Sequence, residues 1–359
     1  MKKSLILLAF FIIFLLIPFS TAYGMEDDIV IISLAGDVML DGSVRKVIDR
    51  YGYSYPWEGV EHYFRNSHLS VINLETSITD RGTIWPDKEY NFRSSYKNLD
   101  AMKKAGINIA TLANNHVLDY GYDGLLDTLM YLEKSGIQYA GAGRNKEEAL
   151  KGSIVEINGL KVGIIAFSRV IPHVDWYATN KRPGLVGAYD GHTHDMMKRI
   201  DDLKREVDIL ILSIHWGKER SSYPRAEEIA VAKKAIDRGV DIVMGHHPHV
   251  LQGIEIYKDK PIFYSLGNFV FGGSDNLTRT TMIGQVAIKG KKVHRVEIIP
   301  CYITDGKPTP LKGNERNQVI QYIRELSNPF KTNISDHGII RINTRSKAVN
   351  YLSQFKTKY

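Results

Sequence analysis

Cysteine is almost absent from this sequence. Cys301 is the only one among 359 residues, so an internal disulfide cannot form and a metal site built from several thiolates is excluded. The fold must therefore be held by its hydrophobic core, with help from any metal that it binds. We interpret Cys301 as a small buried apolar residue.

The sequence also lacks a strong excess of one charge. Lys and Arg number 47 against 40 Asp and Glu, without the clustered stripe that nucleic-acid binders carry. We expect no nucleic-acid partner, whereas a mild positive charge fits contact with an anionic wall or polymer. Repeats and low-complexity linkers are missing too, and no clear boundary divides residues 27–345. A hydrophobic content of 43% predicts a folded protein with a sizeable core.

One long apolar run stands at the start of the chain. Lys2 and Lys3 precede uncharged residues 5–19, and small residues follow at Ala22 and Gly24. This arrangement predicts a secretory signal peptide over residues 1–24. The run is shorter than the roughly 20 residues of a relaxed membrane span, and an uncleaved N-terminal anchor is the alternative. We expect an exported protein, extracytoplasmic or at the cell surface.

Short β-branched runs alternate with segments of helical spacing, and each run ends in polar residues. The runs are 29–35, 69–74, 107–113, 208–214, 240–244 and 261–266. The helical segments are 99–104, 125–134, 196–205 and 226–238. Such alternation predicts an α/β architecture in which ligands bind beyond the carboxyl ends of the strands.

Two hairpins predict that the sheet is mixed. Asn158-Gly159 separates runs 154–157 and 161–167, and a Lys-Gly-Lys-Lys turn separates 281–288 from 293–299. We expect residues 168–189 to form a long loop that borders the site. We expect a helix over 314–326, a last strand over 338–343 and a polar tail over 346–359.

The polar residues at the strand ends are types that bind metals or transfer protons. They are Asp37, Glu75, Asn115, His116, His215, His247 and His249. Pro248 stiffens the backbone between the last two histidines. Such a mixed nitrogen and oxygen set suits manganese, iron or zinc. Singly, Asp37 could cap a helix, Asn115 serve a turn and His215 be a core histidine. Their joint occurrence at successive strand ends favours a functional site.

Six ordered motifs within residues 30–271 resemble the CapA family of capsule or poly-γ-glutamate synthesis proteins, whose domain is similar to the calcineurin-like metallophosphoesterases. They are G-D-V-M-L from Gly36, N-L-E from Asn73, A-N-N-H-x-x-D-Y-G from Ala113, H-W-G from His215, G-H-H-P-H-V-L-Q from Gly245 and Y-S-L-G-N-F-V-F from Tyr264. The resemblance implies a metallophosphoesterase-like two-sheet sandwich of mixed strands, flanked by helices, over residues 27–345.

The resemblance also implies two metal positions. The second would be held by Glu75, Asn115, His215 and His247, and the first by Asp37, Glu75 and His249. Where the phosphoesterase pattern has a histidine in the first position, this chain has Met39, a poor ligand for a hard cation. The resemblance therefore leaves open whether the site binds one metal ion or two. We expect the side chain of His246 to be directed away from the cluster.

Further roles follow from the resemblance. His116 would face the substrate as a general acid or stabiliser of charge, and Asp119 would orient it. Arg93 and Asn268 are candidate substrate contacts, because the fork of an arginine binds carboxylate or phosphate in a bidentate manner.

The resulting hypothesis is a protein of capsule or poly-γ-glutamate biosynthesis or export. As an enzyme it would be a metal-dependent hydrolase of amide or ester bonds in an anionic cell-surface polymer. The first alternative is a non-catalytic, polymer-binding accessory protein of a membrane synthesis complex. The second is a metallophosphoesterase, for which Met39 and Glu75 are unfavourable.

Overall fold

The computed structural model describes residues 29–189 and 191–342. The predicted signal peptide or anchor (1–24) and the polar tail (346–359) lie outside the described residues. Among the helices that are described, none has both the length and the apolar character needed to cross a membrane.

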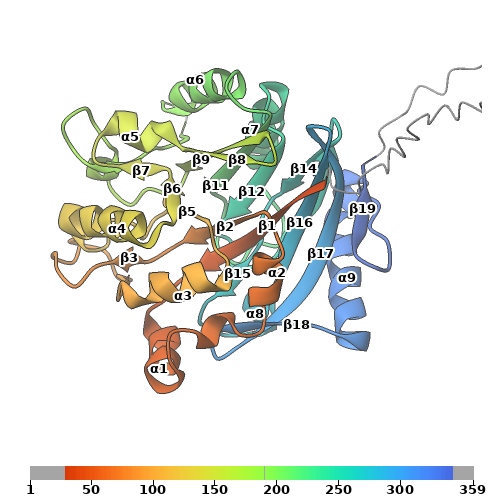
Figure 1. The fold of residues 1–359 in the computed structure, drawn as a ribbon, viewed down its shortest axis with the longest axis horizontal. Coiled ribbons are helices and arrows are strands. Elements are labelled where there is room, and N and C mark those ends of the chain that lie inside the picture. The colour runs from red at the N-terminus through yellow and green to blue at the C-terminus, as the bar shows by residue number, and fades with distance from the viewer. Residues whose placement is uncertain (1–28, 190, 343–359) are drawn as a thin grey trace, which may run out of the picture.

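Two mixed β-sheets form the centre of the molecule (Figure 1). In the first, the order is β18-β17-β16-β1-β2-β5-β6, with β15 also pairing with β1 and β19 with β17. Its strands are β1 (Ile29–Val38), β2 (Leu69–Leu74), β5 (Ile109–Thr111), β6 (Gln138–Ala140), β15 (Asn268–Val270), β16 (Thr280–Lys289), β17 (Lys292–Thr304), β18 (Lys307–Pro310) and β19 (Ile339–Arg341). Strands β1, β2, β5 and β6 are parallel, whereas β16 to β18 are antiparallel.

The second sheet has the order β13-β14-β12-β11-β9-β8. Its strands are β8 (Ser153–Ile157), β9 (Leu160–Ser168), β11 (Ile209–His215), β12 (Ile242–His246), β13 (Ile254–Tyr257) and β14 (Lys260–Phe263). Two short pairs lie outside both sheets: β3 (Ser77–Ile78) with β4 (Arg93–Ser94), and β7 (Ala142–Gly143) with β10 (Gly184–Leu185).

Helices flank the two sheets (Figure 1). They are α1 (Gly42–Tyr51), α2 (Glu61–Arg65), α3 (Lys97–Ala105), α4 (Gly121–Ser135), α5 (Lys146–Lys151), α6 (Thr193–Lys204), α7 (Ala226–Asp237), α8 (Asn276–Arg279) and α9 (Gly313–Ser327). Short 3-10 turns occur at η2 (Tyr55–Trp57), η3 (Val174–Trp176) and η4 (Asn328–Phe330). The predicted α/β class, with two mixed sheets flanked by helices, is confirmed.

Side-chain alternation along the strands separates three apolar cores. Ile211 and Met244 belong to the core that also holds Leu34 of β1, whereas Ile72 packs with residues of α3 and α4, and Val243 with residues of α6 and α7. Because alternate residues of a strand point to opposite faces, His215 lies on the same face of β11 as Ile211, whereas a register shift between Leu34 and Asp37 interrupts the alternation of β1.

Two glycines allow the polar strand ends to approach one another. A Cβ atom on Gly36 would lie 1.9 Å from the carbonyl oxygen of Gly267, and one on Gly245 would lie 2.0 Å from that of Tyr264. Glycine is required at both positions because any side chain would collide with backbone. The close approach lets the N–H of Asp37 donate to Gly267 O at 3.0 Å.

The segment predicted as a long loop over 168–189 contains short elements. It includes η3 and β10, and Trp176 within it is fully buried. Strand β10 pairs with β7, which lies far from it in the sequence. No periodic pattern within residues 168–189 indicates this strand, because its formation depends on that distant partner.

Candidate metal centre

Glu75 is the centre of the candidate site. It directly follows β2, its side chain is 0% exposed, and neither carboxylate oxygen has a hydrogen-bond partner among the described residues. Burial, and next the charge of Asp37, raise its pKa well above the ordinary value. An ionised carboxylate at this position would be costly without a cation beside it, and a divalent metal ion would fit the position.

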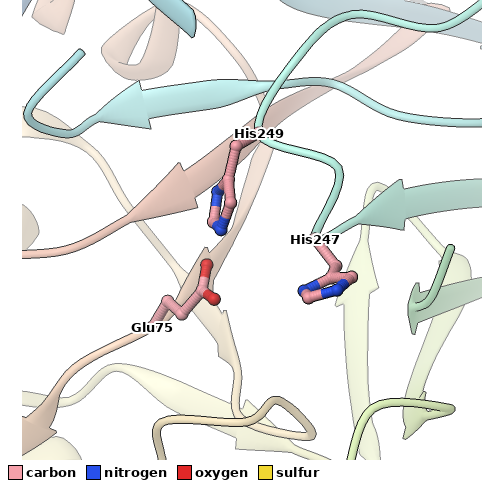
Figure 2. Close-up of side chains that lie close together, drawn as sticks. All are labelled: Glu75, His247 and His249. Carbon is pink, nitrogen blue, oxygen red and sulfur yellow. The ribbon is translucent and has the colours of Figure 1, made fainter. Parts of the chain in front are cut away.

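Histidines surround that carboxylate. Ligand atoms of Glu75, His247 and His249 all lie within 4.8 Å of one another. Figure 2 shows the imidazole of His249 pointing at the Glu75 carboxylate, with the His247 ring alongside. A second group with the same spacing is formed by Asp37, Glu75 and His215. The two groups share Glu75, so five of the six candidate ligands, all but Asn115, converge around one carboxylate.

His215 links the two sheets at this point. Its Nε2 lies 2.7 Å from Oδ1 of Asn115 and 3.5 Å from Oε1 of Glu75. Burial, and next the proximity of His247, lower the pKa of His215 well below its ordinary value. Burial likewise lowers the pKa of His247 to about 3. Both imidazoles are therefore neutral at physiological pH, which is the form that binds metal.

The H-P-H step has an unusual backbone. His247 has φ of 93° and His249 has φ of 57°, on either side of Pro248. Left-handed geometry is uncommon for residues other than glycine, and where it persists it clusters at functional sites. The two rings thus reach the same carboxylate although they are only two residues apart.

Asp37 is surrounded by donors. Oδ1 accepts the amide of Asn73 at 2.9 Å, and Oδ2 accepts the backbone N–H of His247 at 3.3 Å. Burial opposes its ionised form, but hydrogen bonds from His246 and His249 outweigh burial and lower its pKa well below the ordinary value. For His249, burial is outweighed by the charges of Glu75 and Asp37, which raise its pKa to about 9.

The expectation that His246 points away from the cluster is wrong. Its side chain is fully buried, and Nδ1 lies 3.1 Å from Oδ1 of Asp37. His246 is the last residue of β12, and Ile242 and Met244 of the same strand belong to the core between the sheets. Alternation places His246 on that same face, and the sequence pattern contained this signal.

Asparagines hold the charged residues in place. Asn268, a candidate substrate contact in the sequence, is 2% exposed. Its Oδ1 lies 2.9 Å from Nδ1 of His249, and its Nδ2 donates to Thr278 O. Nδ2 of Asn114 donates to Oδ1 of Asn73, and Nδ2 of Asn73 donates to Oδ1 of Asp37. No sequence pattern marked Asn73 as a site residue, although it lies two residues before Glu75 in the N-L-E motif.

His116 and Asp119 form a pair beside the cluster. Nδ1 of His116 lies 2.7 Å from Oδ2 of the fully buried Asp119. Burial lowers the pKa of His116, although Asp119 opposes this. Nε2 has no hydrogen-bond partner within the described residues. Lys88, which no sequence pattern indicated, lies 2.7 Å from Oδ1 of Asp119.

Arg93 lies outside the ligand cluster. Its backbone N–H donates to Oδ2 of Asp41 at 2.9 Å, and its guanidinium carbon lies 4.7 Å from the ring centre of Tyr120. The side chain makes no ion pair with another described residue. Together with Arg45, Asn98, Asp49 and Asp80 it lines a polar cavity of about 140 Å³, which none of the six candidate metal ligands lines.

Met39 occupies the position of the missing histidine. Its sulfur accepts the backbone N–H of Asp41 at 3.2 Å, just before α1. A thioether is a poor ligand for a hard cation, so the first metal position implied by the resemblance would have fewer ligands than the second.

Comparison with known proteins identifies the family. Residues 31–273 match the family model described as bacterial capsule synthesis protein PGA_cap. The chain belongs to this family. It is 30% identical over 303 residues to capsule biosynthesis protein CapA of Bacillus anthracis, covering 83% of this chain and 74% of that protein. It is 32% identical over 304 residues to PGA biosynthesis protein CapA of Bacillus subtilis, covering 84% and 79%.

Another relative is the probable polyglutamine synthesis accessory protein of Mycobacterium tuberculosis, 32% identical over 286 residues and covering 68% of this chain and 74% of that protein. Among solved structures, GAP50, the anchor in the inner membrane complex of Plasmodium, matches at 11% identity with a TM-score of 0.39, covering 84% of this chain and 95% of that one. A Vps29 mutant of Entamoeba histolytica matches with a TM-score of 0.30 at 14% identity, covering 67% and 95%. Likenesses at these scores carry no conclusion about activity.

Proposed function

We propose that this PGA_cap protein is an exported, metal-dependent hydrolase that cleaves amide or ester bonds in an anionic cell-surface polymer of the poly-γ-glutamate type. One observation carries the proposal. Among the residues that the structure describes, the fully buried Glu75 has no hydrogen-bond donor for either oxygen, and it lies among His215, His247 and His249. A site of this composition binds manganese, iron or zinc.

The residues divide into binding and proton-transfer groups. Glu75, Asn115, His215 and His247 would hold one ion, and Asp37 and His249, with Glu75, a weaker second position. A bound divalent ion supplies Lewis-acid polarisation and activates water for attack. Nε2 of His116 would protonate the leaving group, because Nδ1 is held by Asp119. Asn268 would orient His249 rather than contact substrate, since its amide is already engaged.

The polymer is inferred from charge and from the relatives. Arg93 offers a guanidinium without an ion-pair partner in the described residues, next to a polar cavity. A free carboxylate on each repeat of a γ-linked glutamyl chain suits such a group. The Bacillus subtilis relative is named for PGA biosynthesis. Membrane synthesis proteins would be the partners at the site of export.

The competing function is a non-catalytic accessory protein that binds the growing polymer in the same site. Met39 favours it, because loss of one ligand weakens the first metal position. The Mycobacterium tuberculosis relative is named as a probable accessory protein. The His116–Asp119 pair favours catalysis instead, since a binder has less need of a proton-transfer pair.

Metal content tests the first part of the proposal. Wild-type protein and His247→Ala are purified without chelator and analysed by mass spectrometry for manganese, iron and zinc. We expect bound metal in the wild type and a clear loss in the variant. If the wild type takes up none of the three metals when they are supplied, the metal proposal fails.

Turnover tests the second part. The metal-loaded protein is incubated with γ-glutamyl oligomers, aryl phosphates and peptidoglycan fragments, with His116→Ala beside it. We expect cleavage of the γ-glutamyl oligomers, reduced roughly 10²-fold or more in the variant. Metal-dependent binding without turnover would establish the accessory function, and turnover of aryl phosphates alone would establish a phosphoesterase.

A further inference from the structure

The segment between β3 and β4, residues 79–92, is attached to the protein through Asp119. The backbone N–H of Trp85 donates to Asp119 O at 2.8 Å, and that of Phe92 donates to Oδ2 at 2.7 Å. The ring of Phe92 lies 4.7 Å from the ring of His116. Asp119 is therefore both the partner of His116 in the proton-transfer pair and a hydrogen-bond acceptor for this segment.

Lys88 reaches the same place from the middle of the segment. Its side chain is only 11% exposed, and Nζ lies 2.7 Å from Oδ1 of Asp119 and 3.0 Å from Nδ1 of His116. Nζ also donates to the carbonyl oxygen of Tyr90. A lysine ammonium has three N–H groups, and Oδ1 of Asp119 and the carbonyl oxygen of Tyr90 are acceptors for two of them. Its contacts are internal, so it is not placed to bind substrate directly.

Charge explains why a lysine is needed here. Asp37, Glu75 and Asp119 are all fully buried, yet within the described chain Lys88 is the only Lys or Arg whose side-chain nitrogen lies within 4.0 Å of any of them. Removing one partner of a buried ion pair leaves an uncompensated charge. Oδ1 of Asp119, whose close neighbour is Lys88, would be left in that state.

The position of Lys88 also determines which ring nitrogen of His116 is open. Asp119 and Lys88 both lie at Nδ1, so Nε2 is the nitrogen left for a substrate. The segment meets its neighbours through Trp85, whose ring lies 5.5 Å from that of Trp176 and 5.8 Å from that of His173. Arg93 follows directly, on β4. A shift of the segment would therefore move His116 and Arg93 together.

We propose that Lys88 is a positioning residue that holds residues 79–92 and the His116–Asp119 pair as one unit, so that Nε2 of His116 stays aimed at the substrate. This inference deepens the proposed hydrolase and rests on it for the consequence on turnover. The attachment of the segment, in contrast, is a property of the protein alone and is measurable without substrate.

The test compares Lys88→Met, which removes the charge at similar length, with Lys88→Arg, which keeps it. Lys292→Met, an exposed lysine of β17, is the matched control. Hydrogen exchange at the amides of Trp85 and Phe92 is measured in all full-length proteins. We expect exchange about tenfold faster or more in Lys88→Met, near-wild-type exchange in Lys88→Arg, and no change in the control.

Steady-state kinetics on γ-glutamyl oligomers give the second readout. In Lys88→Met we expect kcat to fall about tenfold or more while KM changes less than about threefold, because an aimed proton donor acts in the transition state. Lys88→Arg should recover part of kcat. If Lys88→Met does not fold, Lys88→Gln, which keeps donors without the charge, replaces it with the same expectations.

Two results would overturn the inference. One is unchanged hydrogen exchange at the amides of Trp85 and Phe92 in Lys88→Met, and the other is a wild-type kcat in the same variant. Failure of the proposed function looks different. If the wild type cleaves no γ-glutamyl oligomer, the hydrolase proposal falls, and the exchange data still decide whether Lys88 holds the segment.

Discussion

His246 and Asp37 are in direct contact in the wall of the candidate metal centre. Nδ1 of His246 lies 3.1 Å from Oδ1 of Asp37, and both side chains are fully buried. His246 is absent from both groups of potential ligands within the described residues, whereas Asp37 belongs to one of them. If Asp37 binds metal as proposed, His246 would be an outer partner that orients it, an arrangement that tunes metal affinity.

Replacing His246 should weaken metal binding without removing a ligand. We expect His246→Leu to bind manganese about 10- to 100-fold more weakly than the wild type, the usual cost of losing an outer partner. His246→Asn, which keeps a donor near the position of Nδ1, should lose less. Isothermal titration calorimetry on metal-depleted protein measures both, and equal affinities in all three proteins would rule out the orienting role.

Restoring the missing histidine should create a stronger first metal position. Met39 stands two residues after Asp37, and it turns its sulfur to the N–H of Asp41. In Met39→His an imidazole replaces a thioether that hard cations avoid. We expect metal content to rise from about one ion towards two per chain. Met39→Leu is the control, and an identical metal count in both variants would contradict the prediction.

Arg93 should contribute to the binding of the polymer by pairing with its negative charge. Arg93→Gln removes the guanidinium that lines the polar cavity while the backbone hydrogen bond to Asp41 remains. We expect affinity for γ-glutamyl oligomers to fall by about tenfold, within the range for a charge-assisted hydrogen bond. Oligomers whose free carboxylates are amidated should bind wild type and variant equally. A loss of the same size for both ligands would show that Arg93 supports the fold and does not bind carboxylate.

The stability of the protein should depend on pH through Asp127, which contacts residues at the start of segment 79–92. It is buried on α4, where it accepts the hydroxyl of Thr79 at 2.6 Å and Nε of Arg81 at 2.9 Å. Burial opposes its ionised form, but the hydrogen bonds from Arg81 and Thr79 outweigh burial and lower its pKa. The stabilisation is therefore complete above the ordinary carboxyl pKa of about 3.9 and disappears as the pH falls through the lower folded-state pKa.

We accordingly expect Asp127→Asn to cost about 1–3 kcal/mol of unfolding free energy at pH 7, with the difference from wild type shrinking below about pH 4. Urea unfolding across this pH range provides the measurement. Asp123→Asn removes an exposed partner of the same Arg81, at 3.6 Å, and should change stability little. A pH-independent difference for Asp127→Asn would contradict the assignment.

Much of the architecture was predictable because it is local. The Asn158-Gly159 turn produced the hairpin of β8 and β9, and the apolar run over 69–74 became β2 at the same residues. The strand expected over 107–113 is shorter, since β5 covers only Ile109–Thr111. After Thr111 the backbone leaves the sheet, and the N–H of Leu112 makes the last bond to β6.

The partners of the site were harder to predict. His246 could have been found from alternation along β12, because Met244 two residues earlier faces the core between the sheets. Lys88 gave no such signal. It lies in an irregular segment, 28 residues before His116, and only folding brings its ammonium to Nδ1 of that imidazole.

By itself, the sequence determined the class of the fold and the kinds of ligand available at the strand ends. Period-two alternation and turn residues act over a few positions, so one chain suffices to reveal them. The tertiary structure decided which of these groups meet. Within the described residues Glu75 lacks hydrogen-bond donors, and His246 contacts Asp37 where the two sheets meet, whereas Lys88 reaches Asp119 from the segment between β3 and β4. Such contacts depend on the packing of segments far apart in the chain, and burial then determines the charge that each group can carry.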